Sequence, residues 1–164
     1  MARLLVVLFS VASLTGTEVA GQSKREPLPG VWQAVEVTVA GRGARTITVP
    51  EPRPNLIIVT ARHYSRVEVH AEGPRPIPAD LTKANATELR AVWGPFVGEA
   101  GTYEVTGNRI TMRPIVAKDP AVMGPGSFIT YSYKLDRDTL WLTQQRNQNG
   151  PIANPVSVKA IRVE

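Results

Sequence analysis

The chain of 164 residues contains no cysteine and only two histidines. Without cysteine it can form no disulfide, iron–sulfur or zinc–thiolate site. His63 and His70 are separated by an odd number of positions, so on one regular strand they face opposite sides and cannot bind the same ion. The sequence therefore predicts no metal site and no cofactor.

The chain also lacks the short motifs of common enzyme classes. It has no glycine-rich phosphate loop and no dinucleotide fingerprint, and Gly124-Pro-Gly-Ser127 does not match the G-x-S-x-G elbow. His63 and Ser65 could share one face of a strand, but the ordinary role of such residues is to hydrogen-bond a turn or a neighbour. We therefore assign no catalytic residue, and whether the protein is an enzyme stays open.

Acidic residues are outnumbered by basic ones, which gives a formal net charge of +5 and a pI of about 9.9. The basic residues are mostly arginines, but they are scattered and no run of them alternates with aromatics as in nucleic-acid binding proteins. The pattern indicates a solvated basic surface and no nucleic-acid partner. Attraction to anionic polymers or envelope surfaces is the alternative.

One apolar run stands out, and it lies at the N-terminus. Arg3 precedes the stretch Leu4 to Leu14, which has the length of a signal-peptide core and is too short to span a bilayer. Small residues up to Gly21 suit cleavage there, so 1–21 is predicted to be a signal peptide and 22–29 a flexible lead-in. The alternative is a buried first strand or helix. Without a cysteine for lipidation, we expect an exported protein, periplasmic or extracellular, with no stable membrane anchor.

Residues 30–164 are predicted to form one all-β domain. Alternating apolar and polar residues, separated by turn signals, predict strands at Val31–Val39, Arg45–Val49, Leu56–Thr60, Tyr64–His70, Thr102–Thr106, Arg109–Ile115, Phe128–Leu135, Thr139–Gln144 and Val156–Val163. The turn segments Gly107-Asn108 and Asp136-Arg-Asp138 predict hairpins. About eight or nine short strands in series favour a closed antiparallel up-and-down β-barrel, with a sandwich as the second choice.

A single short helix is predicted in the middle of the chain. Asp80 can cap it, and Gly94-Pro95 ends it. One apolar stripe would run along it, formed by Leu81, Ala84, Leu89, Val92 and Trp93. We expect this stripe to pack on the barrel as a lid or flank; a partner-binding helix is the alternative.

Several segments together resemble a known family. Gly30-Val31-Trp32 resembles the G-x-W signature of lipocalins. The more specific segments are Thr60-Ala-Arg-His-Tyr-Ser65, Gly101-Thr-Tyr-Glu-Val105, Arg113-Pro-Ile-Val-Ala-Lys-Asp-Pro120 with Met123-Gly124, and Asp138-Thr-Leu-Trp-Leu-Thr143. In this order they resemble the bacterial exported lipocalin-like domain proteins over nearly all of the mature chain.

The resemblance implies a lipocalin-like, calycin-type barrel in which Trp32 plugs the closed end and Arg162 packs over it. It also implies a binding site for a small hydrophobic or amphipathic molecule, and it transfers no catalytic residue. The chain departs from typical secreted lipocalins in lacking disulfides and in having the mid-chain helix, so their ligands are not carried over.

Within such a barrel, alternate strand positions face the interior. The candidate ligand-binding residues are Trp32, Glu36, His63, Tyr64, Tyr103, Met112 and Tyr131. Tyrosines offer apolar area and one hydroxyl to an amphipathic ligand. Glu36 has the same strand parity as Trp32, so it either points inward or is turned to solvent by a twist or bulge. Met123 could line an entrance, although its loop is more often a plain connector.

Three functions remain open from these residues. The first is a non-catalytic barrel that binds a small hydrophobic or amphipathic ligand. The second is a cyclase or isomerase on the same scaffold, with Glu36 and Tyr103 as an acid–base pair. The third is an envelope interaction module with a filled core and a basic outer face. The first is our preferred hypothesis. The oligomeric state is left open.

Overall fold

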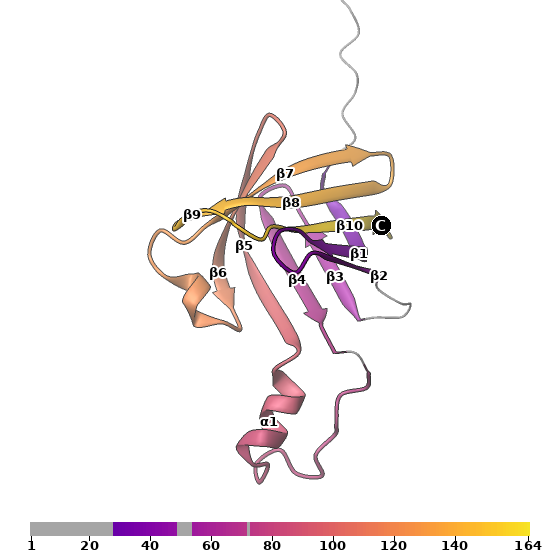
Figure 1. Ribbon diagram of the computed structural model, residues 1–164, viewed down its shortest axis with the longest axis vertical. Coiled ribbons are helices and arrows are strands. Elements are labelled where there is room, and N and C mark those ends of the chain that lie inside the picture. The colour runs from indigo at the N-terminus through magenta and orange to yellow at the C-terminus, as the bar shows by residue number, and fades with distance from the viewer. Residues whose placement is uncertain (1–27, 49–53, 72) are drawn as a thin grey trace, which may run out of the picture.

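The computed structural model describes residues 28–48, 54–71 and 73–164. The predicted signal peptide and all but the last two residues of the predicted lead-in lie outside this part of the chain. The described residues form one sheet of ten strands, one α-helix and one 3-10 helix (Figure 1).

Eight strands close into an antiparallel up-and-down barrel, as predicted. In order around the barrel they are β1 (Gly30–Val39), β3 (Asn55–Val59), β4 (His63–Val69), β5 (Phe96–Thr106), β6 (Arg109–Ala117), β7 (Ile129–Asp136), β8 (Thr139–Asn147) and β10 (Val156–Arg162). The last strand, β10, pairs with both β8 and β1, which closes the ring. The short β2 (Arg45–Thr48) pairs with β1, and β9 (Gly150–Pro151) pairs with β8.

The closed end of the barrel is built around Trp32. Its side chain is fully buried, and its indole Nε1 donates a hydrogen bond to the Leu28 carbonyl at 3.1 Å. The Arg162 guanidinium lies 4.1 Å from the centre of the Trp32 ring, a cation–π contact. Gly30 makes this cover possible, because a Cβ at that position would lie 2.1 Å from Arg162 Nη1. The geometry that the resemblance implied for Trp32 and Arg162 is therefore present.

A β-bulge in β1 changes which side chains face the core. Ala34 pairs with Ala160 of β10, but the next pair is Glu36 with Lys159, so Val35 is the extra residue. The Asn55 side chain stabilises this point: its Oδ1 accepts from the Ala34 N–H at 2.6 Å, and its Nδ2 donates to the Ala34 carbonyl at 3.1 Å. Beyond the bulge, Val37 and Val39 take the inward positions.

The helix exists, but it begins later and packs less than the sequence suggests. α1 (Ala86–Trp93) is capped by Asn85, whose side chain accepts from the Glu88 N–H while Glu88 bonds back to the Asn85 N–H. None of its residues is buried, and it projects away from the barrel (Figure 1). The expected lid or flank packed on the barrel was therefore wrong. No helix in the described ranges is long and apolar enough to cross a bilayer.

Candidate functional site

The barrel is solid at one end and hollow toward the other. Trp32, Ile110 and Leu140 are fully buried and fill the closed end. Toward the other end lie two adjoining cavities of about 230 and 290 Å³, whose common lining residues are Arg66, Glu99 and Val122. We call this hollow region the mouth cavity. A barrel of eight strands is wide enough for side chains or one small ligand. In this barrel side chains fill one end and leave the other end hollow.

A charged cluster forms the shared wall of the mouth cavity. Arg66 and Glu99 are partners in the β4–β5 pairing, and Arg66 Nε lies 3.1 Å from Glu99 Oε1. The N–H at Nε is buried and not aligned for a hydrogen bond, so the contact is an ion pair only. Glu68 Oε1 lies 3.8 Å from Arg66 Nη1, and its other oxygen, Oε2, lies 2.7 Å from His70 Nε2. Two carboxylates therefore balance one guanidinium inside the barrel.

Burial and charge shift the protonation of this cluster. Burial, together with the Glu99 carboxylate, raises the pKa of Tyr64 far above its usual value of 10.0. Burial on its own lowers the pKa of Arg66, but the surrounding acidic groups outweigh it and the net pKa is raised. Burial likewise opposes ionisation of Glu68, yet the His70 hydrogen bond and the Arg66 charge lower its pKa. At neutral pH the cluster therefore holds a protonated phenol, a guanidinium and ionised Glu68.

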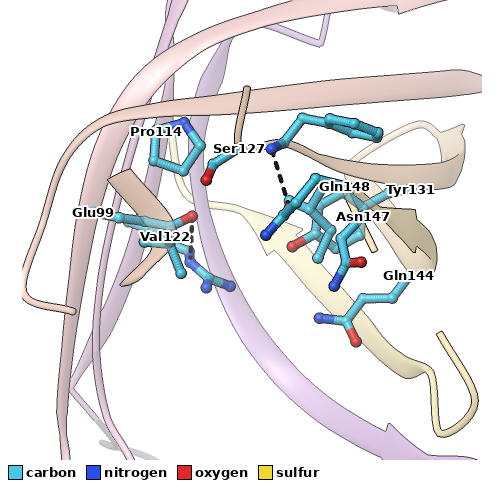
Figure 2. Close-up of a pocket in the computed structure, with 11 residues that line it drawn as sticks. Glu99, Pro114, Val122, Ser127, Tyr131, Gln144, Asn147 and Gln148 are labelled. Atoms are coloured by element: carbon cyan, nitrogen blue, oxygen red, sulfur yellow. Dashed lines mark hydrogen bonds and ion pairs between the residues drawn. The ribbon is translucent and has the colours of Figure 1, made fainter. Parts of the chain in front are cut away.

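The opposite wall of the mouth cavity carries amides. Gln144 and Asn147 of β8 and Gln148 of the following turn lie across from Glu99 and Val122 (Figure 2). Tyr131 of β7 lies beside them, and burial raises its pKa as well. Each side-chain amide carries one donor group and one acceptor group, and the Arg66–Glu99 pair places a donor beside an acceptor. The cavity therefore suits a ligand group that both donates and accepts hydrogen bonds.

The predicted site residues divide into three places. Tyr64 and Tyr131 lie at the mouth cavity: the Tyr64 hydroxyl donates to Glu99 Oε1 at 3.2 Å, and Tyr131 lines the cavity wall. Met112 is buried in the core cluster. Trp32 lies at the closed end and acts as its plug. Of these four predicted contacts, the structure thus places two at the hollow region and two in the solid core.

Three other predicted contacts do not face the cavity. The bulge at Val35 turns Glu36 to the outer side, where it pairs with Lys159. His63 is exposed at the start of β4, and its backbone N–H donates to Thr60 Oγ1 at 3.1 Å in a turn. Tyr103 faces inward, but its hydroxyl donates to the Thr60 carbonyl at 2.7 Å. Glu36 and Tyr103 therefore lie on opposite sides of the barrel wall and cannot form the acid–base pair.

Sequence reasoning missed the charged residues of the site. Arg66 and Glu68 follow Tyr64 at alternate positions of β4, so strand parity alone would have placed them on the same face. Gln144 continues the inward positions of Leu140 and Leu142 in the same way. Glu99 has no such signal, because β5 begins six residues before the predicted strand. Buried charges are rare, which argues against inward placement unless partners are known.

The loop before β7 contributes Val122 rather than Met123. The 3-10 helix η1 (Pro120–Met123) is capped by Asp119, whose side chain accepts from the Ala121 N–H at 2.9 Å. Val122 lines both parts of the mouth cavity, whereas Met123 accepts a hydrogen bond from the Ala117 N–H at its sulfur. The loop is therefore part of the cavity wall, but through Val122 and not through Met123, the residue we predicted.

Comparison with protein-family models, curated proteins and solved structures found no match to this chain.

Proposed function

We propose that this barrel binds one small, partly apolar molecule in the mouth cavity and performs no chemistry on it. The observation that carries the proposal is the hollow region itself, which is lined by a half-buried Arg–Glu pair while the other end of the barrel is filled. Ligand sites are typically concave and largely apolar, with a few convergent polar groups. Arg66, Glu99 and Gln144 are those groups here.

The charge balance of the cluster selects the polar group of the ligand. Arg66 is already compensated by Glu99 and Glu68, so an added carboxylate would meet two negative charges for one positive. A hydroxyl or amide can instead accept from Arg66 and donate to Glu99. We infer an amphipathic ligand whose polar group is neutral.

The wider setting is also a proposal. The N-terminal run after Arg3 and the small residues up to Gly21 support export with removal of 1–21. The motifs around Gly30 and Gly101 support a place among the lipocalin-like proteins. The barrel would then act in the periplasm or outside the cell.

Binding of the neutral fluorophore 1-aminoanthracene tests the proposed function. We expect saturable binding at one site, weakened about tenfold or more by Val122→Trp, which fills the cavity, and little changed by Val122→Ala. Val67→Glu, on the outer wall, is the matched control and should bind like the wild type. Octan-1-ol should displace the dye more strongly than octanoate. Equal binding by Val122→Trp would overturn the proposed site, and stronger displacement by octanoate would overturn the neutral polar group.

A further inference from the structure

The outer surface of β3 to β6 carries an apolar area that the core does not use. Two adjacent cross-strand rows form it: Leu56, Val67 and Gly98, then Ile58, Ser65, Ala100 and Val116. We call these residues the outer apolar face. Its large side chains are substantially exposed: Leu56 39%, Ile58 40%, Val67 44% and Val116 60%. A shallow groove of about 370 Å³ runs over its β3–β4 part.

Such a face is unusual on the outside of a barrel. Outward positions normally alternate as polar residues with the apolar inward ones. On β1 and β10 they do: Glu36 pairs with Lys159, and Thr38 with Ser157. The outer apolar face contains no charged residue in either row. Contiguous exposed apolar surface of this kind marks a contact site.

Cations lie at both edges of the outer apolar face. Beyond the Ile58 row, the next outward position on β6 is Arg113, which pairs with Thr102, and Arg62 is exposed just before β4. At the other edge, Lys118 Nζ donates to the Phe96 carbonyl at 2.7 Å, and Arg75 lies 5.9 Å from the centre of the Phe96 ring.

These four cations are not neutralised by carboxylates of the described residues. Arg75 and Lys118 bind backbone carbonyls, and Arg113 lies over the Phe128 ring at 5.7 Å. The ion pairs in the described part of the chain involve other cations. Of the acids on the same strands, Glu68 and Glu99 point into the barrel, and Glu104 is exposed on β5 beyond the Thr102–Arg113 pair, without an ion pair to any of the four cations. The face is thus apolar in the middle and positive at its edges.

An aromatic pair extends this surface toward α1. Trp93, at the end of the helix, is 48% exposed and packs edge-on against Phe96, with 6.0 Å between the ring centres. Phe96 pairs with Val69 beside the outer apolar face. Tryptophan favours the boundary between water and lipid, where its ring is buried and its N–H stays hydrated.

We propose that the outer apolar face docks on the surface of an anionic lipid bilayer. Val67 and Ile58 enter the boundary between headgroups and acyl chains, and Arg62, Arg75 and Arg113 contact the headgroups. Lys118 adds positive charge at the edge of this face, while its Nζ donors bind backbone carbonyls. Apolar burial and attraction between basic side chains and anionic lipid add together in such binding. A second copy of the chain is disfavoured, because a two-fold contact would bring the same cations against each other. This inference does not depend on the proposed ligand.

Vesicle sedimentation tests the docking. Because the run 4–14 would itself bind lipid, the chains compared begin at Gln22 and contain every described residue. Phosphatidylcholine vesicles with and without about a third phosphatidylglycerol are compared at low and high salt. We expect binding to the anionic vesicles, weakened about tenfold or more by Val67→Glu or by Arg62→Glu with Arg113→Glu.

The matched controls separate this surface from the rest of the barrel. Val163→Glu changes a valine of similar exposure outside the outer apolar face, and Val122→Trp blocks the mouth cavity; both should sediment like the wild type. Unchanged thermal unfolding of Val67→Glu shows that the variant is folded. Equal binding to both vesicle types would overturn the proposal, as would undiminished binding by Val67→Glu. Self-association that Val67→Glu abolishes, without vesicle binding, would assign the face to a second copy instead.

Discussion

Trp32 shows how one residue closes the barrel. Its ring is fully buried, its N–H is satisfied by Leu28, and Arg162 covers it from the last strand. Gly30 leaves the space that the guanidinium occupies. The G-x-W pattern is thus explained by a local hydrogen bond to Leu28 and by the contact with Arg162, which forms only when β10 pairs with β1. Loss of the ring would remove both contacts at once.

Trp32→Ala should lower the free energy of unfolding by about 3–5 kcal/mol, because it leaves a cavity the size of an indole. Trp93→Ala is the matched control: this tryptophan is about half exposed on α1, so we expect a change below about 1 kcal/mol. Urea unfolding followed by circular dichroism measures both. Similar losses in the two variants would contradict a core role for Trp32.

The lowered pKa of Glu68 makes part of the stability pH-dependent. A carboxyl with a lower pKa in the folded state stabilises fully above its ordinary value of 4.5, and this contribution is lost as the pH falls through the folded pKa. The difference in unfolding free energy between wild type and Glu68→Gln should therefore shrink between about pH 6 and pH 3. Glu104→Gln, at an exposed position of β5, is the control and should show no such change. A pH-independent difference would contradict the ion pair.

At the level of elements, irregular positions decide where side chains go. The bulge in β1 turns Glu36 outward and places Val37 and Val39 at the inward positions. A second bulge, where β5 meets β6 at Gly101, brings the Arg113 carbonyl against the strand. α1, by contrast, is held by its capping box at one end. At its other end, the Arg75 and Lys118 side chains donate from distant segments to the carbonyls of Val92, Trp93 and Gly94.

Gly101→Ala should lower the free energy of unfolding by about 1–3 kcal/mol. A Cβ at this position would lie 2.0 Å from the Arg113 carbonyl oxygen, so β5 and β6 would have to separate locally. Gly73→Ala is the control, since a Cβ there meets nothing within 4 Å, and we expect little change. Thermal unfolding and amide exchange in β5 and β6 measure the effect. Equal stability of the two variants would contradict the close approach of β6 to Gly101 at the bulge.

For the whole molecule, the main feature is a barrel solid at one end and hollow at the other. The aromatic residues reflect this arrangement: of the four tyrosines in the chain, Tyr64, Tyr103 and Tyr131 have raised pKa values, with burial as the largest cause. A phenol with a raised pKa in the folded state contributes stability below its unfolded pKa. That contribution is lost as the pH rises through the folded pKa.

Alkaline titration followed at 295 nm should therefore show fewer tyrosines ionising near pH 10–11 in the native protein than in the unfolded chain. In Tyr131→Phe, the number of tyrosines that ionise in this pH range should be unchanged in the native protein and lower by one in the unfolded chain. Stability should fall once the unfolded tyrosines ionise. Coincident native and unfolded curves would contradict the burial of these phenols.

Much of the architecture follows from local sequence patterns. Alternation of apolar residues and the turn at Gly107-Asn108 predicted the strands and the closed barrel, because side-chain period and turn chemistry act over a few residues. Strand parity also placed Tyr64 and Tyr131 on the inner face. Trp32 as the plug came from the resemblance rather than from the pattern.

The site depended on contacts between segments far apart in the chain. The outward turn of Glu36 requires Asn55 to hold the bulge, and the inward placement of Arg66 is tolerated only because Glu99 pairs with it across the sheet. Whether α1 packs on the barrel also depends on where the ends of β4 and β5 direct it. Periodicity is a property of neighbouring residues, whereas register, bulges and charge compensation arise only when the strands pair.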